Sequence, residues 1–136
     1  MDQVYTATIK TLAPETLRNW LKEGNQRLAV VDVRDSDYRY GRVRGAVNYP
    51  SKSLSNEAFD KLLREYPLED NYKYVFHCMR SQMRGPAATK KFVRYLLLNT
   101  PLKDDPSRLP KVYLLEGGLK KWNRLYGNNP SLMETI

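Results

Sequence analysis

The fold of this chain is decided by one stretch, residues 72–98, which reads YKYVFHCMRSQMRGPAATKKFVRYLLL. Residues 72–76 are mostly aromatic or β-branched, which favours a strand. From about Pro86 to Leu98 apolar residues recur at helical spacing, which favours a helix. Its predicted inward positions are Ala88, Phe92, Tyr95 and Leu96. The stretch therefore predicts a strand, a loop over residues 77–86 and a helix.

The loop in this stretch carries the residues suited to chemistry. Cys78 and Arg84 lie six positions apart, so the chain between them can close around one tetrahedral oxyanion. Backbone N–H groups of such a loop, together with a helix N-terminus, favour a bound anion and the thiolate form of a cysteine. Cys78 is therefore a candidate nucleophile and Arg84 a candidate oxyanion clamp. The alternative is a Cys78 that serves as a small buried apolar residue at the end of a strand.

Further strands and helices alternate along the rest of the chain. Residues 28–33 (LAVVDV) are apolar with little alternation, which is typical of a strand buried on both faces of a parallel sheet. Other strands are predicted at residues 4–9, 45–50 and 111–115, a polar loop at residues 34–44 and a Pro-rich loop at residues 99–110. This order predicts an α/β fold with a mainly parallel sheet, whose ligands bind beyond the carboxyl ends of the strands.

Three more helices are predicted from their start and stop signals. The first opens at Ala13-Pro14-Glu15 and ends at Gly24. The second has its N-cap at Ser53, Ser55 or Asn56 and ends before Pro67. The last follows Gly117-Gly118, carries Leu119, Trp122 and Leu125, and is capped by Gly127.

Composition limits the class of protein. The chain has 136 residues, of which 41% are hydrophobic, so residues 1–136 are expected to form one globular domain. A single Cys excludes an internal disulfide framework, and a Cys/His zinc site is hard to build from one Cys and one His. No signal peptide and no membrane span are expected. A reducing compartment follows, the cytoplasm, with the nucleus as the alternative.

The net charge of +8 favours anionic partners. The basic residues are spread along the chain, and no nucleic-acid motif accompanies them, so we expect no nucleic-acid partner. Arg80 either adds anion attraction at the rim of the loop or points into solvent.

The residues suggest a covalent phosphatase mechanism. The thiolate of Cys78 would attack phosphorus in line, Arg84 would bind equatorial oxygens through its planar fork, and water would hydrolyse the cysteinyl-phosphate. No metal or cofactor is required. The general acid is not identified: Glu116, at a strand end beside Gly117-Gly118, is one candidate, and Asp35 and Asp37 are alternatives, although each also fits a plain surface charge.

Two residues beside the loop have supporting roles in this reading. Asp32 ends a buried strand, where it orients the loop or Arg84, or makes a plain turn or salt bridge. His77 precedes Cys78 on a strand, and neighbours on a strand point to opposite faces. We therefore expect His77 to be a buried hydrogen-bonding residue behind the loop rather than a base for Cys78.

The chain resembles a known family along nearly its whole length. Residues 30–34 (VVDVR), residues 41–50 (GRVRGAVNYP), the Cys78 loop, and Gly117-Gly118 with Trp122 resemble the successive signatures of the rhodanese domain. The resemblance implies a three-layer fold with a central, mainly parallel sheet flanked by helices. One departure is Arg42, where that family usually has His in a Gly-His-Ile-x-Gly-Ala pattern.

The size of the loop points to a branch of this family. Rhodanese-fold sulfurtransferases typically have one residue fewer between Cys and Arg. His-Cys-x5-Arg-Gly-Pro is similar to the M-phase inducer dual-specificity phosphatases, the fungal arsenate reductases and the small fungal rhodanese-like phosphatases. The resemblance implies that Cys78 is the nucleophile, that Arg84 is the clamp, and that phosphate binds to the backbone amides of Met79, Arg80, Ser81, Gln82 and Met83.

The predicted function is a phosphatase acting on phosphoesters, including phosphoprotein and phosphotyrosine. The alternatives are an arsenate reductase with the same anion pocket, a thiosulfate sulfurtransferase, and a non-catalytic binding module. Because Cys78 is the single Cys of the chain, recovery from oxidation and any arsenate reduction would need an external thiol such as glutathione, with glutaredoxin.

Overall fold

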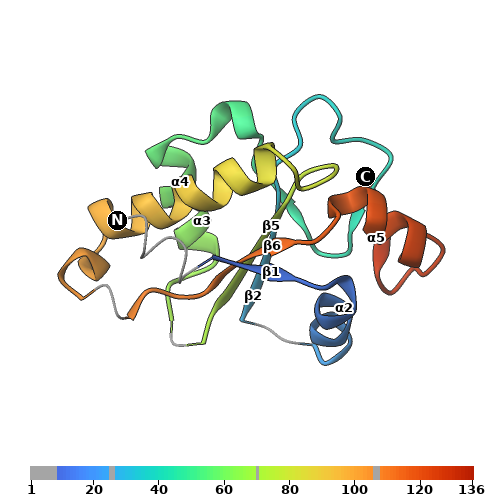
Figure 1. Cartoon of the computed structure of the whole chain (residues 1–136), viewed down its shortest axis with the longest axis horizontal. Coiled ribbons are helices and arrows are strands. Elements are labelled where there is room, and N and C mark those ends of the chain that lie inside the picture. Colours follow the sequence, from blue (N-terminus) through green and yellow to red (C-terminus); the bar gives the residue numbers. More distant parts are fainter. Residues whose placement is uncertain (1–8, 25–26, 70, 106–107) are drawn as a thin grey trace.

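The computed structural model describes residues 9–24, 27–69, 71–105 and 108–136. Within these residues five strands form one parallel sheet in the order β1-β6-β5-β2-β4 (Figure 1). The strands are β1 (Ile9–Leu12), β2 (Leu28–Asp32), β4 (Val47–Asn48), β5 (Lys73–His77) and β6 (Val112–Leu115). The predicted mainly parallel sheet is confirmed.

The two central strands, β2 and β5, are buried on both faces. Val31 and Phe76 pack into the core on one side of the sheet, whereas Val30 and Val75 pack into the core on the other. This division follows from the alternation of side chains along a strand. It explains why both strands lack polar positions that repeat with a period of two.

Helices cover both faces of the sheet, which gives three layers (Figure 1). The helices α3 (Asn56–Glu65) and α4 (Arg84–Asn99) lie on one face, where Phe59 and Phe92 are buried. On the other face lie α2 (Pro14–Lys22) and α5 (Gly118–Tyr126), with Leu17 and Trp122 buried. The parallel register of β2 and β5 places Asp32 opposite His77, so the segments after both strands emerge at the same edge of the sheet.

The predicted helix boundaries are largely confirmed. Gly24 follows α2 with a left-handed φ of 68°. Of the three N-cap candidates for α3, Ser55 is the cap, because its Oγ accepts a hydrogen bond from the Ala58 N–H at 3.2 Å. The exception is α4, which begins at Arg84 rather than at Pro86. The first helical turn therefore carries Arg84 and adjoins the Cys78 loop directly.

Some predicted strands and loops differ from the structure, and one lies largely outside the described residues. Most of the strand expected at residues 4–9 lies outside the described residues, and β1 runs from Ile9 to Leu12 instead. The expected loop over residues 34–44 contains β3 (Gly41–Val43), which pairs antiparallel with β7 (Met133–Thr135). Short 3₁₀ turns, η1 (Ser51–Ser53) and η2 (Pro101–Asp104), interrupt the segments after β4 and α4.

The pairing of β3 with β7 gives Arg42 contacts of its own. Its Nε donates a hydrogen bond to Glu134 Oε1 at 2.8 Å, and its Nη1 donates to the Tyr38 hydroxyl at 2.8 Å. Arg42 therefore ties two segments that are distant in the sequence. The usual His of the family pattern is replaced by a residue with its own structural contact.

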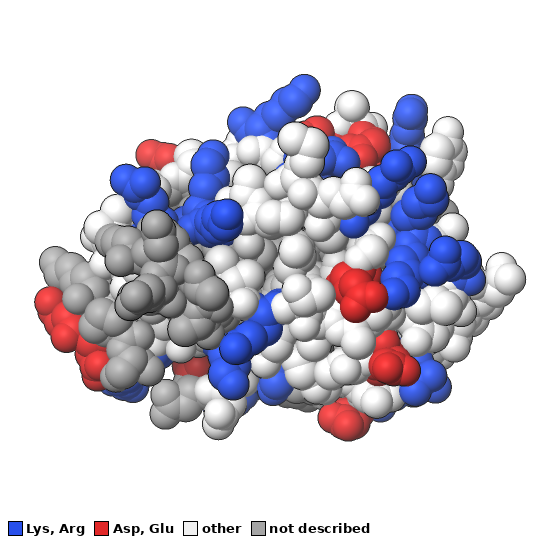
Figure 2. Space-filling model, in the orientation of Figure 1, with Lys and Arg blue, Asp and Glu red and all other residues white. Residues whose placement is uncertain are grey.

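On the face of the molecule that Figure 2 shows, charge is spread out rather than gathered in one place. Figure 2 shows Lys and Arg side chains scattered over one face, with Asp and Glu side chains among them. Among the described residues there is no helix whose length and apolar character would allow it to cross a membrane.

Candidate active site

Cys78 follows β5 at the carboxyl edge of the sheet, and only 3% of its surface is exposed. Its Sγ accepts hydrogen bonds from the backbone N–H groups of Ser81 at 3.2 Å and Gly85 at 3.3 Å. The first N–H comes from the loop and the second from the first turn of α4. Both donors stabilise negative charge on the sulfur.

The chain from Cys78 to Arg84 surrounds an open hollow of about 300 Å³, which we call the Cys78 hollow. Its lining consists of Asp37, Cys78, Met79, Arg80, Gln82, Met83 and Arg84. The predicted loop interior therefore lines the hollow except at Ser81. Ser81 has a left-handed φ of 56°, which turns the chain so that its N–H faces the sulfur.

The outer side of the loop is fixed by the N-terminus of α5. Leu119 N–H donates to the Cys78 carbonyl at 3.1 Å, and Lys120 N–H donates to the Met79 carbonyl at 2.9 Å. Gly118 allows this approach, because a Cβ at that position would lie 2.6 Å from the Met79 oxygen and 2.7 Å from the Cys78 oxygen. Gly118 also has a φ of 61°, which disfavours other residues.

Arg84 is held by two carboxylates on the loop after β2. Its Nη1 and Nη2 donate to the two carboxylate oxygens of Asp37, each at 2.7 Å, and Nη1 also lies 3.3 Å from Asp35 Oδ2. Hydrogen bonding to Arg84 holds the pKa of Asp37 at about 2, against its ordinary value of 3.8. The same contact with Asp37 raises the pKa of Arg84. At neutral pH Asp37 is therefore ionised and has no proton to give while this pair persists.

The loop that carries both carboxylates is itself anchored. Asp35 accepts hydrogen bonds from Ser51 Oγ at 2.6 Å and from the Lys52 N–H at 3.0 Å. These contacts, with Arg84, outweigh the effect of burial and lower the pKa of Asp35. Its own N–H donates to Asp37 Oδ1 at 3.0 Å. The alternative in which Asp35 and Asp37 are plain surface charges was wrong, because both carboxylates contact Arg84.

Asp32 acts on Arg34 and does not contact Arg84. The Asp32 carboxylate and the Arg34 guanidinium form a buried pair, with Nη2 2.8 Å from Oδ2. Arg34 then donates to the backbone carbonyls of Asp37 at 3.0 Å and Gly41 at 2.8 Å. Asp32 thus supports the loop after β2 through Arg34. Of the roles considered for Asp32, the structure shows the salt bridge.

His77 is fully buried behind the loop. Its Nδ1 lies 3.0 Å from the Cys78 carbonyl oxygen, whereas its Nε2 has no hydrogen-bond partner within the described part of the chain and lies 3.9 Å from Asp32 Oδ2. Burial lowers the pKa of His77 below 6.5, although the Asp32 charge opposes the shift. The imidazole contacts the backbone of Cys78 and makes no hydrogen bond to its sulfur.

We expect acid to destabilise the folded protein through His77. Folded His77 stays neutral, whereas the unfolded chain takes up a proton near pH 6.5, so the free energy of unfolding falls as the pH drops below that value. The slope is at most about 1.4 kcal/mol per pH unit. Urea unfolding at about pH 7.5 and about pH 5.5 measures it. His77 is the single His in the chain, so His77→Gln should flatten the dependence; an equal pH dependence in both proteins would contradict the prediction.

Glu116 was expected to approach the site as a candidate general acid, but it does not. Its side chain is 51% exposed and pairs with Lys121 on the first turns of α5, and it is not among the residues that line the Cys78 hollow. It therefore lacks the position of a general acid. Among the described residues, no group of three or more His, Cys, Asp or Glu side chains could hold a metal ion.

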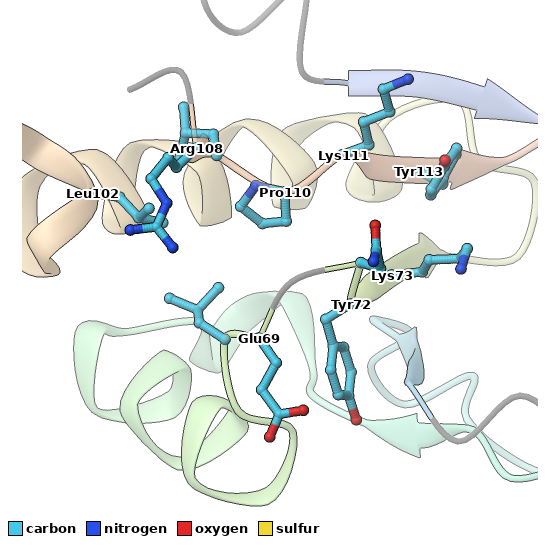
Figure 3. A pocket seen from close by; sticks show the side chains of 11 residues that line it. Glu69, Tyr72, Lys73, Leu102, Arg108, Pro110, Lys111 and Tyr113 are labelled. Carbon is cyan, nitrogen blue, oxygen red and sulfur yellow. The ribbon is translucent and has the colours of Figure 1, made fainter. Parts of the chain in front are cut away.

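A second hollow of about 380 Å³ lies at the opposite end of the strands, where β5 and β6 begin (Figure 3). Lys73, Lys111, Tyr72 and Tyr113 line it, with Glu69 from the segment before β5. Cys78 and Arg84 are at the other end of the sheet. This hollow therefore takes no part in the chemistry of the Cys78 loop.

The contact of Asp37 with Arg84 is the main one that was not predicted, because Asp37 was considered only as an alternative general acid. The available signal was the spacing Asp35-x-Asp37 directly after a buried strand. Because β2 and β5 are adjacent and parallel, acidic residues after β2 lie beside the loop after β5.

Comparison with known proteins agrees with this geometry. The family model described as a rhodanese-like domain matches residues 13–125. The dual specificity phosphatase ibp1 of Schizosaccharomyces pombe is 31% identical over 141 residues, which cover 94% of this chain and 98% of that protein.

Two solved structures have the same fold. Ygr203w, a yeast protein tyrosine phosphatase of the rhodanese family, matches with a TM-score of 0.79 at 29% identity, covering 95% of this chain and 94% of its own. The As-Sb reductase of Leishmania major matches with a TM-score of 0.77 at 31% identity, covering 93% of this chain and 86% of its own.

Proposed function

Because this chain belongs to the rhodanese-like domain family, we propose that it is a cysteine-dependent phosphatase that hydrolyses phosphoesters through Cys78. The observation that carries the proposal is the Sγ of Cys78, which receives two backbone N–H groups and shares an open hollow with Arg84. A sulfur in this setting is suited to attack a tetrahedral centre whose oxygens are bound by the loop.

The reaction proceeds in two displacements. In the first, the thiolate attacks phosphorus, an S–P bond forms, and the P–O bond to the leaving group breaks. In the second, water attacks the cysteinyl-phosphate, which releases inorganic phosphate and regenerates the thiolate. Arg84 and the backbone amides of the loop residues that line the hollow, Met79, Arg80, Gln82 and Met83, bind the equatorial oxygens in both steps.

The substrate is a phosphorylated protein or a small tetrahedral oxyanion. The Cys78 hollow is open, so a phosphate on a protein side chain reaches the sulfur without a deep channel. The net charge of +8 favours an anionic partner. The nucleophile works only as a free thiol, so we place the protein, acting as a single domain, in a reducing compartment, the cytoplasm with the nucleus as the alternative.

Arsenate reduction is a second candidate, favoured by the similarity to the Leishmania major reductase. Arsenate would first condense with Cys78 and lose water. Glutathione would then supply the second thiol, so that As(V) becomes As(III) while Cys78 and glutathione form a mixed disulfide. The chain has no second Cys, so glutaredoxin or another thiol must reduce that disulfide.

We expect phosphate esters or arsenate to be turned over in preference to thiosulfate. The loop from Cys78 to Arg84 encloses five residues and surrounds a hollow large enough for a tetrahedral anion. The assay compares an aryl phosphate, arsenate with glutathione and glutaredoxin, and thiosulfate with cyanide, with Cys78→Ser as the blank for all three. Robust sulfurtransferase activity without phosphatase activity would reverse this order.

A further inference from the structure

The contacts of Arg84 leave one edge of its guanidinium unused. A guanidinium has five N–H groups. Asp37 accepts one hydrogen bond from Nη1 and one from Nη2, and Asp35 accepts the second hydrogen bond from Nη1. The remaining two, on Nε and Nη2, have no hydrogen-bond partner in the part of the chain that the structure describes.

Those two remaining N–H groups form a bidentate donor. They lie on the same edge of the planar group and point in parallel, which is the fork that phosphate and carboxylate oxygens accept. Arg84 lines the Cys78 hollow, so this edge is available to an oxyanion held there. The other fork, formed end-on by Nη1 and Nη2, donates its two hydrogen bonds to Asp37.

Asp37 is held firmly enough to orient a neighbour. Its carbonyl accepts hydrogen bonds from Arg34 Nη1 and from the Arg39 N–H, each at 3.0 Å, and its Oδ1 accepts the Asp35 N–H at 3.0 Å. Arg34 is in turn fixed by the buried Asp32. The direction of the Asp37 carboxylate is therefore set from the core of the protein outward.

We propose that Asp37 is a positioning residue that locks the guanidinium of Arg84, so that its Nε–Nη2 edge stays directed at the oxyanion. This inference rests on the proposed function, because it assigns Asp37 a part in the same phosphoryl-transfer site. Without Asp37, Arg84 keeps only its longer contact with Asp35, at 3.3 Å, and its guanidinium must be ordered in each turnover. The pair persists when an anion binds, because the two acceptors use different edges of the guanidinium.

Removing Asp37 has two effects, one on the transition state and one on anion binding. Loss of orientation weakens the stabilisation of the transition state, in which the hydrogen bonds from Arg84 are strongest. Loss of a negative charge beside the hollow favours binding of any anion. For Asp37→Asn we therefore expect kcat to fall by about tenfold or more, while KM stays unchanged or decreases. A purely structural role would lower thermal stability without this split.

The kinetic test uses aryl phosphates whose leaving groups differ in basicity. A positioning residue lowers kcat by the same factor for each of them, whereas loss of a general acid is felt most with the most basic leaving group. Glu116→Gln is the matched control, an exposed carboxylate outside the site, and should leave kcat unchanged. A kcat for Asp37→Asn equal to that of wild type, or a loss that grows with leaving-group basicity, overturns the proposal.

The second test needs no turnover. Nuclear magnetic resonance of the arginine N–H groups, with Arg84→Lys to assign the signal, reports whether rotation of the Arg84 guanidinium is restricted. We expect restriction in wild type both without and with tungstate, a tetrahedral dianion, and fast rotation in Asp37→Asn. Release of the guanidinium on adding tungstate to wild type would mean that Asp37 competes with the anion, which overturns the proposal. Restricted Arg84 with bound tungstate but no phosphatase activity would reject the proposed function and keep this inference.

Discussion

Cys78→Ser should lose phosphatase activity by at least about 10⁴-fold while it keeps the fold and the ability to bind an oxyanion. A serine hydroxyl is not ionised at neutral pH and is a poor nucleophile. The substitution replaces one small buried side chain by another, and the serine oxygen remains close to the N–H groups of Ser81 and Gly85. Activity towards an aryl phosphate, thermal unfolding and tungstate binding measure the three properties.

Cys78→Ala supplies the control for this substitution. It leaves both N–H groups without the acceptor at position 78, so we expect lower stability than in Cys78→Ser, together with the same loss of activity. Near wild-type turnover in Cys78→Ser would exclude a covalent intermediate on this residue.

Arg84→Lys should lower kcat/KM by about 10²- to 10³-fold, which corresponds to roughly 3 to 4 kcal/mol of transition-state stabilisation. An ammonium has no planar fork, so it cannot bind Asp37 end-on and an oxyanion along a second edge at the same time. Because lysine keeps the positive charge, the substitution tests the geometry of the guanidinium separately from its charge. Steady-state kinetics with an aryl phosphate measure the loss.

Arg94→Lys is the matched control for this prediction. Arg94 lies on the same helix, α4, with an exposed side chain, and we expect its replacement to leave kcat/KM unchanged. A change of less than about tenfold in Arg84→Lys would mean that Arg84 is not the clamp.

The sheet and its main helices could be predicted because their signals are local. The centres of β2 and β5 are runs of aliphatic or aromatic residues, and α3 and α4 carry apolar residues at helical spacing. In contrast, β3 and β7 have three residues each and pair across about ninety positions, so no local pattern marks them. The contact of Arg42 with Glu134 exists only after the chain has folded.

Some features of the candidate site are likewise visible in the sequence, whereas others depend on the fold. The spacing of Cys78 and Arg84 is visible in the sequence, and the loop brings both residues to one hollow. The partners of Arg84 are not visible, because they depend on β2 lying beside β5 and on Arg34 fixing the backbone of Asp37. The position of Glu116 at a strand end is visible in the sequence, but the pairing of its side chain with Lys121 is not.

The hydrogen bonds from α5 to the loop also set the polarity of the loop's inner surface. The described peptide bonds are trans, so each carbonyl points opposite to the N–H of the same peptide unit. With the carbonyls of Cys78 and Met79 turned towards the Leu119 and Lys120 N–H groups, the N–H groups of Met79 and Arg80 point away from α5. Were these two peptides reversed, carbonyl oxygens would face an incoming anion and repel it. The last helix of the chain thus keeps the electron-rich ends of two peptide dipoles out of the hollow, and Gly118, by allowing the close approach, makes that orientation possible.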